Sequence, residues 1–116
     1  MSALELIAWA VAYLWVFFYA YILVMGIYRA FLAKRIVKWS RLFWLCLPGI
    51  VIGLSMDVLA NLLIAPFVFR NVPREWLVTS RLVRYRADPA SGWRGESAAA
   101  ICDGLLDPFD PTGDHC

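Results

Sequence analysis

The predicted fold is organised around GIVIGLSMDVLAN at residues 49–61. Every fourth residue in it is small or polar, and these residues are Gly49, Gly53, Asp57 and Asn61. On a helix, residues four apart lie nearly above one another, so these side chains share one stripe of an otherwise apolar surface. A G-x-x-x-G pair lets a second backbone approach closely, and polar groups inside a membrane usually face protein or water. We therefore predict that the stripe packs on the first helix or on a second copy, and the alternative is that it lines a pore.

Two apolar runs predict two membrane spans. Residues 6–28 contain no charged side chain, and residues 42–69 contain only Asp57. A helix needs ~20 apolar residues to cross the hydrocarbon core. The apolar fraction of 62% also exceeds the roughly 45–50% of soluble domains. Because the second run is longer than a straight crossing requires, we expect it to be tilted, kinked or broken, with the membrane helix starting at Pro48 and kinked at Pro66.

These features predict an all-α integral membrane protein with one transmembrane hairpin and a tail. The hairpin would occupy residues 1–70 and the membrane-surface tail residues 71–116. We expect a first short amphipathic helix from Asn71 to about Arg86 and a second one starting at Trp93. The acidic end contains two Asp-Pro steps and a glycine, which disfavour regular structure.

The basic residues lie in two blocks, at 29–41 and 70–94, and both flank apolar runs. Anionic lipid headgroups are therefore the expected partner, and nucleic-acid binding is disfavoured. The candidate headgroup-binding residues are Lys34, Arg35, Lys38, Arg41, Arg74, Arg81 and Arg84.

These two blocks give conflicting signals about orientation, because two complete spans place them on opposite sides of the membrane. Three arrangements stay open: both ends outside the cytoplasm, both ends inside it, or a second segment that re-enters and leaves both blocks inside. The density of arginines after residue 69 favours a cytoplasmic tail.

Cys102 and Cys116 are candidates for a disulfide if the tail lies outside the cytoplasm. With His115 they are also weak candidates for a metal site, although zinc wants four ligands in paired spacing. No Ser-His-Asp set, glycine-rich phosphate loop or acid/base pair is evident in the sequence. We therefore expect a protein that is not an enzyme and has no cofactor.

The second half of the chain contains PREWLVTSR at residues 73–81, GWR at residues 92–94 and LLDPFDPTGDHC from residue 105. From Asp57 onward it resembles small two-span inner-membrane proteins encoded in tailed bacteriophage and prophage genomes. The resemblance implies a phage origin and a location in the host inner membrane, and it carries no catalytic residue.

The leading hypothesis is a non-enzymatic membrane protein that docks on a host or phage membrane component through the stripe at residues 49–61 and the arginine-bearing tail. It would modulate host entry, as superinfection-exclusion proteins do. The expected protein partner is a further copy of the chain or a host membrane protein. One alternative is a holin-like lysis protein, in which Asp57 and Asn61 line a homo-oligomeric pore. Another is a tail whose metal or disulfide site has a structural role.

Overall fold

The first apolar run forms one long helix in the computed structural model, which describes residues 1–113 and 116. Helix α1 covers Ala3–Leu32 and contains no buried residue. It begins where the Ser2 hydroxyl accepts a hydrogen bond from the Glu5 amide at 3.2 Å, which satisfies one of the unpaired amides of the first turn.

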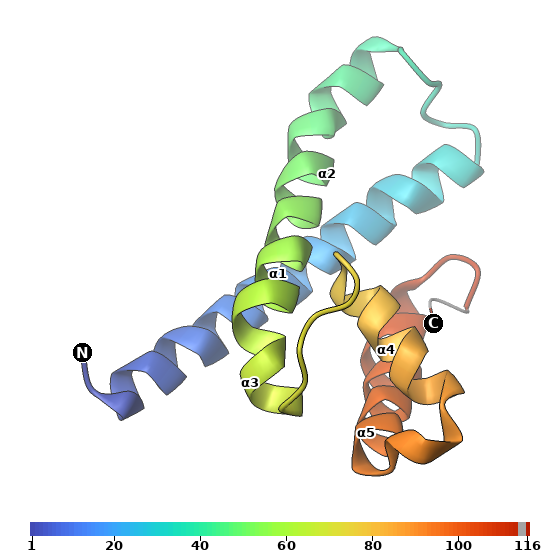
Figure 1. The fold of residues 1–116 in the computed structure, drawn as a ribbon. Helices are drawn as coiled ribbons and strands as arrows, with labels where there is room; N and C mark the ends of the chain where they lie inside the picture. The colour runs from blue at the N-terminus through green and yellow to red at the C-terminus, as the bar shows by residue number, and fades with distance from the viewer. Residues whose placement is uncertain (114–115) are drawn as a thin grey trace. The chain divides into compact units, whose positions relative to one another are not determined.

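The second run forms a continuous helical rod from Arg41 to Phe69 in three parts (Figure 1). These are α2 (Arg41–Leu59), a π-helical turn η1 (Ala60–Ile64) and α3 (Ala65–Phe69). The expected start at Pro48 is wrong, since α2 begins at Arg41 and Pro48 lies inside it. The irregularity is the π-helical turn η1, which ends two residues before Pro66. The rod ends at Arg70, whose backbone is left-handed (φ 51°).

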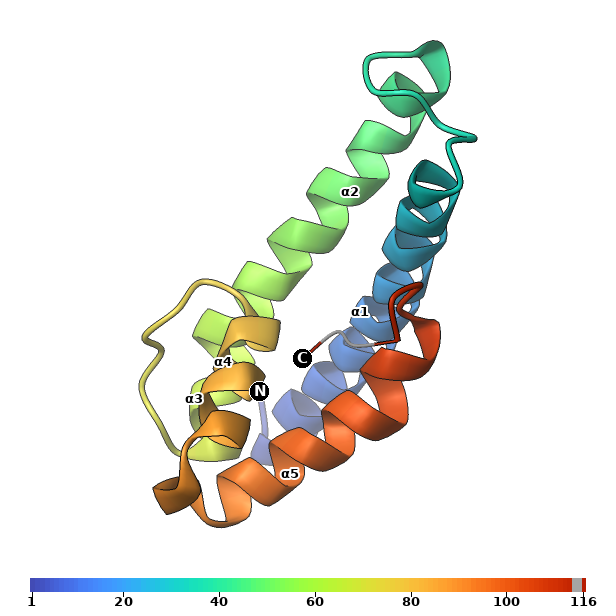
Figure 2. The ribbon, with the colours of Figure 1, turned by 90° about the vertical axis from the view of Figure 1, so that its right-hand side faces the viewer.

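Residues 1–56 make up one compact unit, Met1–Met56. In it, α1 and α2 are joined by residues 33–40 and run in opposite directions (Figure 2). They touch where a Cβ added to Gly53 would lie 2.8 Å from Val24 Cγ2. The Tyr13 hydroxyl also donates to the Met56 carbonyl at 2.7 Å. Most large apolar side chains of both helices are exposed. By length and composition, helix α1 and the rod from Arg41 to Phe69 could each cross a membrane.

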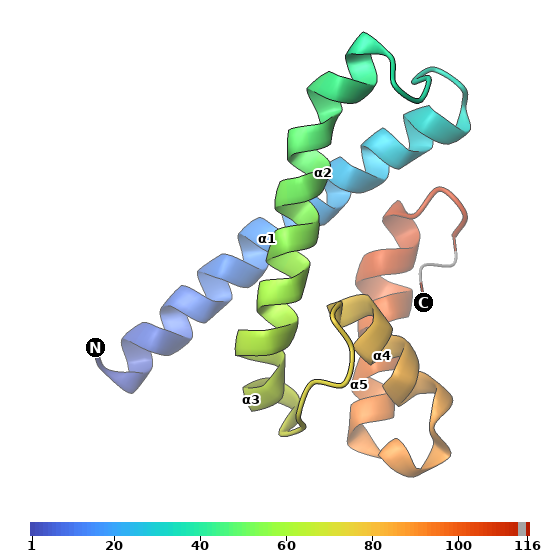
Figure 3. The same cartoon turned by 45° about the horizontal axis from the view of Figure 1, so that its top comes forward.

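Residues 57–116 make up the second unit, Asp57–Cys116. After the rod ends, an irregular segment leads to α4 (Val78–Ala87), and a 3-10 turn η2 (Pro89–Ser91) leads to α5 (Trp93–Ile101). The chain continues through the π-helical turn η3 (Cys102–Leu106) and the 3-10 turn η4 (Asp107–Phe109). Figure 3 shows α4 and α5 side by side. The core of this unit consists of Ala65, Phe69, Leu82, Tyr85, Ala98 and Cys102.

The sequence places the first tail helix too early. We expected it from Asn71, but the chain is irregular until α4 begins at Val78. The left-handed Arg70 ends the rod, and residues 71–77 form no helix of their own. The boundary between the two compact units lies inside the second rod, between Met56 and Asp57.

Candidate functional site

The Asp57 side chain caps the N-terminus of α4. Its Oδ1 accepts a hydrogen bond from the Val78 amide at 2.6 Å. The first amides of a helix have no partner within the helix, and a carboxylate at this end also interacts favourably with the helix dipole. Leu77, the N-cap residue, offers no side-chain oxygen. A residue from the rod therefore fixes the point at which the tail helix begins.

Asn61 is fully buried and links the rod to two parts of the tail. Its Nδ2 donates to the Glu75 carbonyl, and its Oδ1 accepts from Arg81 Nε at 2.6 Å. Both ends of the amide are thus hydrogen-bonded inside the same chain. In an amide with one donor end and one acceptor end, this pattern also fixes the side-chain orientation.

Arg81 lies at the centre of the site, and none of its side chain is exposed. Beyond the bond from Nε to Asn61, Nη2 donates to the Asn61 carbonyl at 3.1 Å. Nη1 donates to the Asn71 carbonyl at 3.1 Å and to the Tyr85 hydroxyl at 3.0 Å. We call Asn61, Asn71, Glu75, Arg81 and Tyr85 the Arg81 network.

The bond to the Asn61 carbonyl has a cause in the backbone. In a π-helical turn, the carbonyl of one residue pairs with the amide five residues later. For Asn61 that position is Pro66, which has no N–H to donate. Arg81 therefore supplies the hydrogen bond that the proline removes from the rod. The π-helical turn, the proline and the buried arginine form one structural feature.

The buried guanidinium is partly balanced by Glu75. One carboxylate oxygen of Glu75 lies 3.8 Å from Arg81 Nε, and the other accepts from Arg84 Nε at 2.9 Å. Arg84 Nη2 adds a second bond to this carboxylate at 3.3 Å. A buried charge is tolerated when it is paired and its hydrogen bonds are complete. Glu75 thus links the buried cation to a partly exposed one.

Arg94 makes a second attachment at the end of the rod. Its Nε donates to the Phe69 carbonyl at 2.6 Å, and its Nη2 donates to the Arg70 carbonyl at 3.2 Å. These carbonyls lie at the C-terminus of α3, where no helical amide remains to pair with them. The Trp93 ring stacks on Phe69 with centroids 6.1 Å apart, and Phe69 also contacts Tyr85. The start of α5 is thereby held against the end of the rod.

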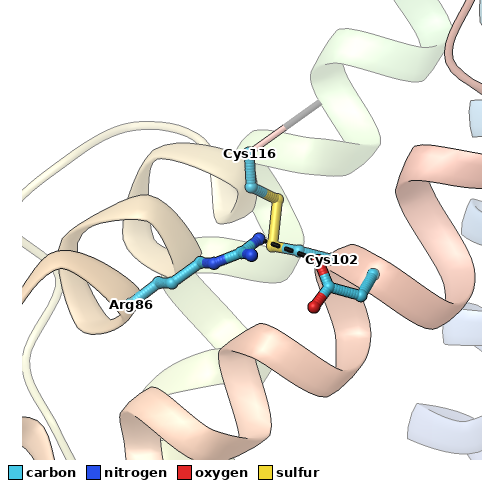
Figure 4. Close-up of a disulfide and its surroundings, with 4 residues drawn as sticks. Arg86, Cys102 and Cys116 are labelled. Carbon is cyan, nitrogen blue, oxygen red and sulfur yellow. Dashed lines mark ion pairs between the residues drawn. A yellow bond between two sulfur atoms is a disulfide. The ribbon is translucent and has the colours of Figure 1, made fainter. Parts of the chain in front are cut away.

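A disulfide between Cys102 and Cys116 closes the tail, with their Cα atoms 5.8 Å apart. Figure 4 shows this bond beside Arg86, which comes from α4 and pairs with Asp103 at 3.0 Å. The buried Cys102 belongs to the core of the second unit. The bond therefore joins the last described residue to that core.

The predicted stripe is divided between two roles. Gly49 and Gly53 lie against α1, where added Cβ atoms would meet Leu23 at 3.9 Å and Val24 at 2.8 Å. Asp57 and Asn61 instead bond to the segment that follows the rod. The glycines therefore permit a helix contact, while the polar pair holds the tail.

The predicted headgroup-binding residues also fall into different settings. The prediction that Arg81 binds a lipid headgroup is corrected, because its guanidinium is buried in the Arg81 network and cannot reach a headgroup. Arg84 is engaged by Glu75, whereas Arg74 is exposed. The remaining predicted residues are all exposed: Lys34, Arg35, Lys38 and Arg41.

Two of the three weak metal candidates form a disulfide. Cys102 and Cys116 are joined to each other, and His115 lies outside the described residues. Within residues 1–113 and 116, no group of three or more His, Cys, Asp or Glu side chains could hold a metal ion.

Sequence reasoning missed the roles of Glu75, Tyr85 and Arg94. The signal for Arg81 was available in principle, because Pro66 deprives one rod carbonyl of its donor and an arginine in the following segment could replace it. No pattern in the sequence identifies which arginine does so.

Comparison with protein-family models, with curated proteins and with solved structures finds no match to this chain.

Proposed function

We propose that this protein is a phage-type inner-membrane protein that acts by binding a host or phage membrane component, without catalysis. The two long apolar rods would anchor it in the bilayer, and the second unit would be the part that binds. Exclusion of a superinfecting phage is the activity that best fits this arrangement.

The proposal is supported mainly by the hydrogen bonds between polar residues of the rod and of the tail. Asp57, Asn61, Arg81 and Arg94 hold a defined unit at the end of the second rod. A tail that served only as a solvated charged end would not need buried hydrogen bonds and a disulfide. A built unit with a fixed surface is what a specific partner requires.

The same observation disfavours the holin-like alternative. A pore lined by Asp57 and Asn61 would need their polar atoms to face water in an oligomer. Asn61 is fully buried and hydrogen-bonded at both ends of its amide, and Asp57 caps α4.

The surface of the second unit offers a residue for testing the binding role. Trp76 lies in the irregular segment before α4 and is 72% exposed. Large aromatic side chains contribute strongly to protein interfaces when a partner covers them. Trp9, in α1, is exposed to a similar extent at 68% and provides a matched control.

The test is a phage challenge of cells that express the full chain at a low level. We expect wild type and Trp9→Ala to lower the plating efficiency of at least one phage in a broad panel, and Trp76→Ala to restore it. Protein level and membrane fraction must be equal in the three strains. Normal plating of every phage on wild-type cells would refute the exclusion activity. Collapse of the membrane potential on expression would instead favour a pore.

A further inference from the structure

We propose that the second unit lies outside the cytoplasm, with residues 33–40 on the cytoplasmic face of the membrane. This inference rests on the membrane location proposed above and adds where a binding partner must be. It reverses the orientation that the arginine density of the sequence favours.

The disulfide is the first observation in its support. Structural disulfides persist in oxidising compartments and are rare in the cytoplasm. When the Sγ–Sγ bond of Cys102 and Cys116 forms, the two thiols lose two protons and two electrons. The disulfide of an extracytoplasmic thiol oxidase takes them up and becomes a dithiol. The bond lies in the core of the second unit, so the whole unit would fold on the oxidising side.

Most arginines of the second basic block already have hydrogen-bond or ion-pair partners in the same unit. Arg81, Arg84 and Arg94 are engaged by groups of the same unit. Arg86 is paired with Asp103. Among the described residues, Arg70 and Arg74 of this block are exposed and form no ion pair. The number of arginines in the block therefore overstates the cations that it offers to anionic lipid.

The first basic block differs from the second. Its cations are all exposed, and within the described part of the chain none of them forms an ion pair: Arg29, Lys34, Arg35, Lys38 and Arg41. Trp39, exposed at 61%, lies beside Lys38 at 5.4 Å from ring centroid to Nζ. Free cations next to an exposed indole fit the anionic surface of the cytoplasmic leaflet, where each cation contributes about 1 kcal/mol.

The second rod excludes the re-entrant arrangement. It is helical through 29 residues, and at 1.5 Å per residue its α-helical parts of 19 and 5 residues alone measure about 36 Å. The hydrocarbon core is about 30 Å thick, so a rod of this length crosses it completely. The two basic blocks must then lie on opposite sides, and the disulfide identifies the outer one. The partner of the second unit would therefore be a component of the envelope, reached from outside the inner membrane.

Two cysteine variants in a Cys46→Ser background test the orientation directly in living cells. Val37→Cys places a thiol in the linker, and Ala90→Cys places one in η2, both at exposed positions. A maleimide that cannot cross the inner membrane should label Ala90→Cys in intact cells and Val37→Cys only in inverted vesicles. Labelling of Val37→Cys in intact cells, or of Ala90→Cys only in inverted vesicles, would overturn the proposal.

The state of the native cysteines gives an independent result. Acid-quenched cells are treated with a maleimide of high mass, with and without prior reduction. We expect Cys102 and Cys116 to react only after reduction, and to react directly in a host that lacks its extracytoplasmic thiol oxidase. Direct reaction of both thiols in the normal host would count against the proposal. Neither experiment uses a phage, so its failure is separate from a failure of the proposed exclusion. Recovery of the chain in the soluble fraction would instead refute the membrane location.

Discussion

Replacing Arg81 with methionine tests whether the buried guanidinium holds the second unit together. Methionine is similar in length and apolar, so it removes the donors without leaving a large cavity. The change would leave Asn61 Oδ1, the carbonyls of Asn61 and Asn71 and the Tyr85 hydroxyl without the donors that now reach them.

The expected cost follows from these lost bonds. Leaving a buried polar group unsatisfied costs about 1–3 kcal/mol, and Arg81→Met leaves several acceptors without a donor, while Glu75 keeps its pairing with Arg84. These effects overlap because all of them come from one guanidinium, so we expect a total loss of about 3–5 kcal/mol. A loss of this size increases the open population of the unit at least roughly a hundredfold, since 1.4 kcal/mol is a factor of ten.

Hydrogen exchange of the full chain in detergent micelles measures this opening. Amides of α4 exchange through opening of the unit, so their exchange rates should rise by the same factor. Arg74→Met is the control, because Arg74 is an exposed residue of the same type in the preceding segment, and its replacement should change stability by less than about 0.5 kcal/mol. Equal exchange rates in the two variants would refute the role of the network.

Three further predictions concern single residues. Asp57→Ala should destabilise α4 by about 1 kcal/mol, because the first amide of this helix loses its cap. Hydrogen exchange at the start of α4 should increase several-fold, while that of α1 stays unchanged. Gly53→Val should lower the thermal midpoint of unfolding in detergent, because a Cβ at this position lies 2.8 Å from Val24 Cγ2 and overpacking costs about 1–3 kcal/mol. Gly26→Val is the control and should have a much smaller effect, since a Cβ there has nothing within 4 Å. Gly92→Ala should cost about 1–2 kcal/mol, since its φ of +60° is unfavourable for residues with a Cβ, and an unchanged exchange rate in α5 would contradict this.

The sequence predicts the disulfide of the tail only as one of several possible roles for its two cysteines. The sequence contains Cys102, Cys116 and His115 near its end, and these residues are compatible with either a disulfide or part of a metal site. Which atoms meet depends on the tertiary fold of the tail, and no local pattern in the sequence encodes it. In the structure the two cysteines are joined in the core of the second unit.

The elements with a local cause could be predicted from the amino-acid sequence. A long run of apolar side chains predicts a long helix wherever it occurs, and both rods agree with this expectation to within a few residues at most ends. The four-residue spacing also placed Gly49, Gly53, Asp57 and Asn61 on one side of the second rod. Backbone geometry alone requires this.

The contacts made by that side of the rod depend on the tertiary fold. The glycines contact α1, whereas Asp57 and Asn61 bind Val78, Glu75 and Arg81 from a later part of the chain. A hydrogen bond between residues twenty apart depends on the path of the intervening chain, which here turns at a left-handed Arg70. Arg81 could be predicted as a surface cation from its residue type. It became the centre of a buried network because Pro66 leaves a rod carbonyl without a donor and the fold brings a guanidinium to that carbonyl.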